Sequence, residues 1–176
     1  MKTLVIVVHP DIAQSKINSR WAAALKQFPE KYTVHDLYAA YPDEQLDVAK
    51  EQALLLAHDK VVFQFPFYWF NCPPLLKKWL DEVLTHGWAY GKNSEYLLAG
   101  KKMALSISAG INEDDYSTDG RYKYSLAALT APFQITFEYI RADYRPLFAF
   151  YGAEHHGSDA RIEQSTSDYL TYLDAL

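Results

Sequence analysis

Apolar runs and helical stripes alternate along the chain from its first residues to its last. Residues 3–8 form a continuous apolar run rich in valine, which is typical of a strand covered on both faces. Residues 15–28 follow with Ile17, Trp21 and Leu25 on one stripe at helical spacing, which predicts a helix with one apolar face. The same two patterns recur and predict further strands over 31–37, 60–65, 102–108 and 144–151, and further helices over 46–57, from 73 onward and over 158–173.

Prolines set several of the predicted boundaries. Pro73 and Pro74 suit the first turn of a helix, where the N–H that proline lacks has no partner in any case. We expect Pro132 to kink or divide a helical stretch over 124–140. Pro146 fits the strand over 144–151 best near its start, because proline cannot donate to a strand ladder.

This order of elements predicts an α/β fold. Five strands interleaved with five helical segments indicate a three-layer sandwich, in which a parallel sheet is covered by helices on both faces. We expect the flavodoxin-like strand order 2-1-3-4-5, in a single domain over residues 1–176. Such a sheet binds its ligand at the switch point between the first and third strands, bordered by the loops after strands 1, 3 and 4.

Composition excludes several classes of function. The formal net charge of −5 argues against a nucleic-acid partner, and we expect no metal site. Residues 1–20 show no signal-peptide pattern, and no apolar stretch approaches the roughly 20 residues of a membrane helix. The single cysteine, Cys72, excludes an internal disulfide and suits a reducing compartment. We therefore expect a cytoplasmic protein.

The first of the three loops covers residues 9–18. A helix that begins here offers free N–H groups and a positive dipole end to a phosphate, and Ser15, Asn18 and His9 can add side-chain donors. The alternative is that Ser15 only caps the helix and His9 is a solvated loop residue. The chain lacks the glycine-rich dinucleotide fingerprint and the Walker A pattern, which argues against a Rossmann dehydrogenase and a P-loop phosphotransferase.

The second loop, residues 65–74, is unusually aromatic. Five of the six residues from 65 to 70 are Phe, Tyr or Trp, although connecting loops normally face water. Stacking on a planar ring system explains them, and packing under another loop or against a second subunit is the alternative. We interpret Cys72 as a packed thiol, since no base lies near it in the sequence.

The third loop leaves the strand over 102–108 through small residues and ends at Gly110, before an acidic segment and Tyr116. Small residues let the backbone approach a ligand closely, and free amides there can stabilise negative charge on a reduced ring. A glycine after a strand is common, so this loop alone is a weak signal.

Four groups of residues, in order along the chain, match one known family. They are residues 7–10 with 15–18, residues 63–70 running into 73–77, residues 81–84 with 86–91, and Tyr116 with residues 131–133. On these motifs the sequence resembles the NAD(P)H:quinone oxidoreductase family, which includes DT-diaphorase and the ancillary subunits of bacterial potassium efflux systems. The resemblance covers roughly residues 2–175.

The resemblance implies a flavodoxin-like homodimer with active sites at the subunit interface. It implies FMN, or alternatively FAD, held without a covalent bond, and alternate binding of NAD(P)H and a quinone-type acceptor. Carried over by position, the flavin would be held by His9, Ser15, Ile17, Asn18, Pro66, Phe67, Tyr68, Trp69, Phe70, Ser108, Ala109 and Gly110. Tyr116 would be catalytic, and Trp88 and Tyr90 would line the acceptor pocket from the partner chain.

Two departures from the family pattern affect these expectations. DT-diaphorase has a histidine some residues after its counterpart of Tyr116, proposed to relay a proton, and residues 117–124 contain none. Ala109 replaces the first glycine of a pair found in some members.

The hypothesis from sequence is ping-pong hydride transfer from NAD(P)H to a quinone-type acceptor through the flavin. The alternatives are a regulatory subunit docked on a potassium efflux antiporter, a one-electron carrier like flavodoxin, and a domain that has lost its cofactor. The sequence does not separate FMN from FAD or NADH from NADPH.

Overall fold

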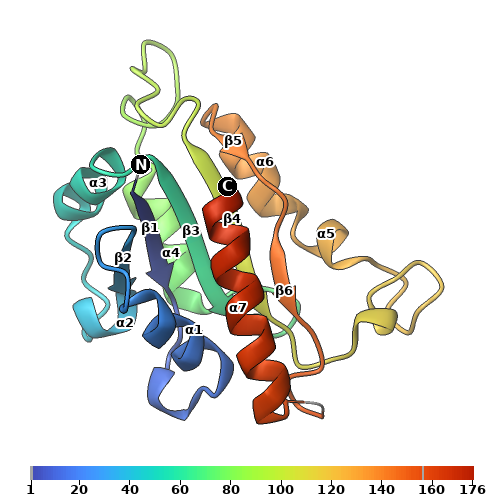
Figure 1. The fold of residues 1–176 in the computed structure, drawn as a ribbon. Coiled ribbons are helices and arrows are strands. Elements are labelled where there is room, and N and C mark those ends of the chain that lie inside the picture. The colour runs from blue at the N-terminus through green and yellow to red at the C-terminus, as the bar shows by residue number, and fades with distance from the viewer. Residues whose placement is uncertain (1, 156) are drawn as a thin grey trace.

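A parallel β-sheet lies between two layers of helices (Figure 1). The computed structural model describes residues 2–155 and 157–176. The strand order is β2-β1-β3-β4-β5, with β6 also paired to β4, and all pairs are parallel. The strands are β1 (Thr3–Val7), β2 (Tyr32–Asp36), β3 (Lys60–Pro66), β4 (Lys102–Ser108), β5 (Asp143–Tyr144) and β6 (Phe148–Phe150). The predicted flavodoxin-like fold is confirmed.

The helices connect these strands on both faces of the sheet. They are α1 (Ile17–Leu25), α2 (Leu37–Ala40), α3 (Val48–Leu56), α4 (Pro74–Val83), α5 (Leu126–Leu129), α6 (Ala131–Tyr139) and α7 (Asp159–Ala175), with short 3-10 turns η1 (Ile12–Gln14) and η2 (Glu113–Asp115). No helix among the described residues is both long and apolar enough to span a membrane.

Alternation along the central strands produces two hydrophobic cores. In β1, Leu4 and Ile6 pack on the core beneath α3, α4 and α6, whereas Val5 and Val7 pack on the core beneath α1 and α7. Successive side chains of a strand point to opposite faces, so a strand between two helical layers is buried on both faces. All five residues of β1 are buried, as its sequence predicts.

Short-range capping explains where several helices begin. Pro73 precedes α4 and Pro74 is its first residue, as predicted, with no side-chain capping bond at Pro73. The Asp47 carboxylate accepts from the Lys50 N–H at 3.0 Å at the start of α3, and an aspartate cap of this kind stabilises a helix by about 1 kcal/mol. Asp36 caps α2 in the same way, accepting from the Ala39 N–H at 3.1 Å. α2 was not predicted, because its four residues are too few to show a helical period.

Two predicted elements differ from the observed ones in extent, and a third agrees with its prediction. The strand over 144–151 is two short strands, β5 and β6, with Pro146 between them. Pro132 lies in the first turn of α6 and the stretch over 124–140 is divided at Thr130, which is the second of the two outcomes expected there. The helix expected over 15–28 is shorter: η1 precedes it, α1 begins at Ile17 and it ends at Leu25.

The two edges of the sheet carry different loops. The carboxyl ends of β1, β3 and β4 lie at one edge, at the bottom of Figure 1, so the loops after these strands meet there. The long loop between α4 and β4, residues 84–101, lies at the opposite edge beside the start of β1 (Figure 1).

Candidate functional site

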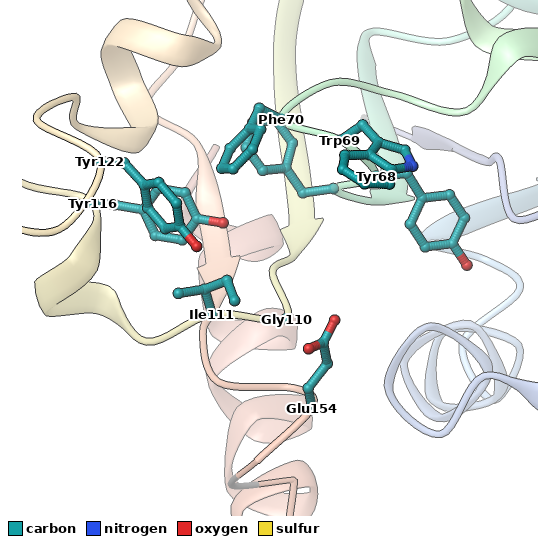
Figure 2. Close-up of a pocket in the computed structure, with 9 residues that line it drawn as sticks. Tyr68, Trp69, Phe70, Gly110, Ile111, Tyr116, Tyr122 and Glu154 are labelled. Carbon is teal, nitrogen blue, oxygen red and sulfur yellow. The ribbon is translucent and has the colours of Figure 1, made fainter.

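A cavity of about 400 Å³ opens at the carboxyl edge of the sheet (Figure 2). The loops after β3, β4 and β6 and the segment after η2 supply its walls. It is lined by Phe67, Tyr68, Trp69, Phe70, Gly110, Ile111, Tyr116, Tyr122 and Glu154. The predicted convergence of the second and third loops is therefore observed.

The turn after β3 presents its aromatic side chains outward. Trp69 and Phe70 have φ of +50° and +60°, a left-handed region that bulky residues rarely adopt. The turn is closed by the Asn71 N–H, which donates to the Tyr68 carbonyl at 2.9 Å. The Trp69 side chain is 93% exposed. Strained backbone and an exposed indole together are typical of a ligand-contacting turn.

Two tyrosines lie beside each other on the cavity wall formed by the segment after η2 (Figure 2). The Tyr116 and Tyr122 rings are 5.6 Å apart at 36°, and the Phe67 ring lies 6.2 Å from that of Tyr116. Burial, and to a smaller extent the nearby Tyr122, raises the pKa of Tyr116 to about 12. The Tyr116 hydroxyl therefore keeps its proton at neutral pH and can donate a hydrogen bond to a ligand.

The loop after β1 is tied to the end of β4 by a buried polar network. The Asn18 side-chain amide donates to the Ser108 hydroxyl at 2.8 Å. The Gln64 amide donates to the Asn18 main-chain carbonyl at 3.0 Å. The Ser15 hydroxyl accepts from the Asn18 N–H at 3.0 Å, as a helix cap would. This network fixes the start of α1, whose first N–H groups have no intrahelical partner.

His9 is buried, so the interpretation of it as a solvated residue is wrong. Burial lowers the pKa of its imidazole, only partly opposed by Asp11 and Asp36, so the ring is neutral at pH 7. Its Nδ1 accepts from the Asp11 N–H at 3.1 Å, which assigns the proton to Nε2. The His9 ring lies 6.2 Å from that of Tyr68, which brings the first loop to the edge of the cavity.

Backbone donors remain available on two walls of the cavity. Within residues 2–155 and 157–176, the backbone N–H groups of four residues have no hydrogen-bond acceptor: Trp69, Phe70, Gly110 and Ile111. The Ala109 N–H, in contrast, donates to the Phe150 carbonyl at 2.8 Å. Aromatic side chains with unpaired N–H groups beside them can hold a planar heterocycle that has acceptor atoms along its edge.

Predicted residues fall into three groups. The structure brings Phe67, Tyr68, Trp69, Phe70, Gly110 and Tyr116 to one cavity, with His9 beside it. Ile17, Pro66 and Ala109 are buried, and Ser108 and Asn18 bond each other behind the loops. Trp88 and Tyr90 belong to the loop at the opposite edge of the sheet, where the Tyr90 ring lies 5.5 Å from that of Tyr139.

Three cavity residues were not predicted: Ile111, Tyr122 and Glu154. Tyr122 lies six residues after Tyr116, in the stretch that lacks the family histidine. Glu154 follows β6, and no local pattern connects it with the other loops.

A second, apolar groove of about 480 Å³ adjoins the cavity between the starts of α4 and α6. Tyr68 and Trp69 border both hollows, and Leu80, Pro132 and Phe133 line the groove. Cys72 also lines it, and burial raises the pKa of its thiol. This agrees with its interpretation as a packed thiol.

Several known proteins are similar to this chain over most of its length. An uncharacterized NAD(P)H oxidoreductase, YrkL, of Bacillus subtilis (strain 168) is 47% identical over 99% of both chains. The potassium-efflux ancillary protein KefG of Cronobacter sakazakii is 44% identical over 77% of this chain and 72% of its own. The crystal structure of general stress protein 14 in complex with FMN from Treponema denticola is 49% identical, covers 99% of both chains and superposes with a TM-score of 0.95.

A family described as having the flavodoxin-like fold matches residues 1–173. This match covers nearly the whole chain and agrees with the observed sheet order. The chain therefore belongs to this family of flavodoxin-like proteins.

Proposed function

We propose that this chain is an FMN-dependent NAD(P)H oxidoreductase that reduces quinone-type acceptors. The observation that carries the proposal is the cavity in which an aromatic turn, two pairs of available backbone N–H groups and the protonated Tyr116 converge. The FMN in the similar structure and the name of the Bacillus relative support the choice of cofactor and reductant. Its proposed location is the cytoplasm, where reduced nicotinamides are available.

The described residues fit FMN at both of its ends. Tyr68, Trp69 and Phe70 would border the ring system, and the N–H groups of Gly110 and Ile111 would bond its polar edge. The free N–H groups at the start of α1 would hold the phosphate, helped by the Nε2–H of His9. Asn18 and Ser108 would keep these two parts in register through their hydrogen bond.

FMN, when bound, would supply the two-electron chemistry between NAD(P)H and the acceptor, and we expect these two substrates to bind in turn. The chain's own part is orientation and electrostatics. Donors at the Gly110 end of the cavity stabilise negative charge along the ring edge. Tyr116 would donate a hydrogen bond from its neutral hydroxyl, and the aromatic turn would exclude water from the stacking face.

A homodimer is part of the proposal. Trp88 and Tyr90 lie at the opposite edge of the sheet from the cavity of their own chain, so only a second copy can bring them to it. The apolar groove between α4 and α6 and the exposed Ile135 and Tyr139, each 64% exposed, offer a surface for that copy. Sedimentation equilibrium, which measures the mass of the particle in solution, tests the homodimer with and without FMN.

Anaerobic mixing tests the activity. The purified chain is loaded with FMN and mixed with NADH or NADPH, and loss of the visible absorbance of the flavin reports the hydride transfer. We expect bleaching by at least one nicotinamide, and recovery of the absorbance on adding a benzoquinone. A chain that binds no FMN, or FMN that stays oxidised with both nicotinamides, contradicts the proposal.

A second function, docking on a potassium efflux protein, is favoured by one observation, the identity with KefG. It predicts that a membrane potassium efflux protein co-purifies with the chain from its own host. A chain that reduces quinones but recovers no such protein would be an enzyme without this regulatory role.

A further inference from the structure

The loop after β6 folds back over the end of β4 and is fixed there by its backbone. Four hydrogen bonds, between 2.8 and 3.2 Å long, join residues 150–154 to residues 109–111. Gly152 has a φ of +72°, which glycine adopts without strain where the chain reverses. The last of the four bonds is donated by the Glu154 N–H to the Gly110 carbonyl at 3.2 Å. Glu154 is therefore held beside Gly110.

The Glu154 carboxyl group occupies the space that a side chain at position 110 would take. A Cβ at Gly110 would lie 2.5 Å from Glu154 Oε1 and 2.8 Å from its Cδ, closer than real Cβ contacts. Figure 2 shows this carboxyl group pointing toward Gly110, at the end of the cavity opposite the aromatic turn. A negative group thus lies against the backbone that offers N–H donors to the ligand.

We propose that Glu154 sets the redox potential of the bound FMN. Its carboxylate, held beside Gly110, would lie near the polar edge of the ring and keep the midpoint potential lower than it would be without this charge. The inference rests on the proposed function, because it requires FMN in this cavity.

The physical argument is a balance of two opposed contributions. Reduction adds negative charge to the polar edge of the ring, and the N–H groups of Gly110 and Ile111 stabilise that charge. A carboxylate beside the same edge repels it. The same charge adds to the raised pKa of Tyr116, after burial and the neighbouring tyrosines Tyr122 and Tyr151. A lower potential makes the reduced protein a stronger donor to its acceptor.

The test is a charge series at position 154. The midpoint potential of the FMN-loaded chain is measured against reference dyes for the wild type, Glu154→Gln and Glu154→Lys. We expect Glu154→Gln to shift the equilibrium toward reduced flavin by roughly tenfold, about 30 mV for a two-electron couple, and Glu154→Lys to shift it further in the same direction. Because Glu154 is exposed, the differences should shrink in high salt.

Glu30→Gln is the matched control, since Glu30 is an exposed glutamate in the turn before β2, at the other edge of the sheet. It should leave the potential unchanged. Equal potentials across the series at position 154, with FMN bound in every variant, overturn the inference alone. An equal shift in Glu30→Gln also overturns it, because the effect is then one of net charge. A wild-type chain that holds no FMN overturns the proposed function and this inference together.

Discussion

Two clusters of polar and aromatic residues beside this sheet differ in whether their hydrogen-bonding groups find partners within the chain. One surrounds Glu51, which is 0% exposed in α3. Its carboxylate accepts from the Tyr41 hydroxyl at 2.7 Å and from the Trp79 indole N–H at 2.9 Å, and it lies 2.8 Å from His35 Nε2. Groups from four parts of the chain thus satisfy one another without any ligand.

The cavity at the carboxyl edge is the opposite case. Its turn holds Trp69 and Phe70 in left-handed conformations, and backbone N–H groups on two walls have no acceptor in the described part of the chain. The two tryptophans make the contrast direct. Trp79 is 1% exposed with its N–H bonded, whereas Trp69 is 93% exposed. A cluster that the chain satisfies itself stabilises the fold, and one left unsatisfied is available to a ligand.

The largest effect is expected from Glu51→Ala. Removing the carboxylate leaves His35, Tyr41 and Trp79 without their partner in the core, so the free energy of unfolding should fall by about 3–5 kcal/mol. Urea denaturation followed by circular dichroism measures it. Glu51→Gln keeps the shape and should lose less, which covers the case in which the alanine variant does not fold. Unchanged stability in both would remove the contrast between the clusters.

Tyr116→Phe should act on the chemistry and spare the fold. Losing one hydrogen bond from a neutral hydroxyl to the charged, reduced ring should slow flavin reduction or reoxidation about 10- to 100-fold. The free energy of unfolding should change by less than about 1 kcal/mol. Anaerobic stopped-flow measures the rates. Tyr124→Phe, at an exposed tyrosine outside the cavity, is the control, and equal rates in all three proteins would end the catalytic role of Tyr116.

Trp69→Ala should weaken FMN binding by up to about tenfold, the scale of one aromatic stacking contact. Stability should stay within about 0.5 kcal/mol, because the indole is exposed in the isolated chain. Fluorescence titration with FMN gives the affinity. Phe28→Ala, at an exposed aromatic residue after α1, should leave it unchanged. An unaltered Kd for FMN in Trp69→Ala would contradict stacking on the flavin and favour the alternative, in which the turn packs against a second subunit.

The smallest effect concerns pH. Burial alone would raise the pKa of Glu51, but hydrogen bonds from His35, Trp79 and Tyr41 outweigh it and hold the pKa below its ordinary value of 4.5. The folded chain then binds fewer protons than the unfolded chain, so this stabilisation is present above pH 4.5 and is lost as the pH falls through the folded-state value. The stability difference between wild type and Glu51→Gln should therefore narrow as the pH falls below 4.5. A pH-independent difference would mean that the carboxylate charge contributes nothing.

Local patterns predicted most of the fold correctly. The first four predicted strands, the start of α4 at Pro74 and the division near Pro132 depend on neighbours within a few residues, and all were confirmed. The break between β5 and β6 was missed because Pro146 was assigned to the start of one strand. Each of these two short strands pairs separately with β4, which only the position of β4 decides.

The residues of the candidate site also divide into those with a local sequence signal and those that only the fold places there. Residues 67–70, Gly110 and Tyr116, which line the cavity, were predicted together because each loop has a local signal: an aromatic cluster, a glycine after a strand, or a family motif. Tyr122 and Glu154 were missed since their place in the cavity depends on loops that return from elsewhere. Glu154 reaches Gly110 across more than forty residues of sequence.

The sequence by itself determined the parallel sheet, its strand order and the edge at which three loops meet. Hydrophobic period and turn chemistry are local, and chain handedness leaves few ways to connect such elements. The tertiary structure alone decided which groups are satisfied. Hydrogen bonds and Coulomb forces depend on distances that the chain sets only once folded, so it is the fold that buries Glu51 among its donors and leaves Trp69, Gly110 and Glu154 around a cavity.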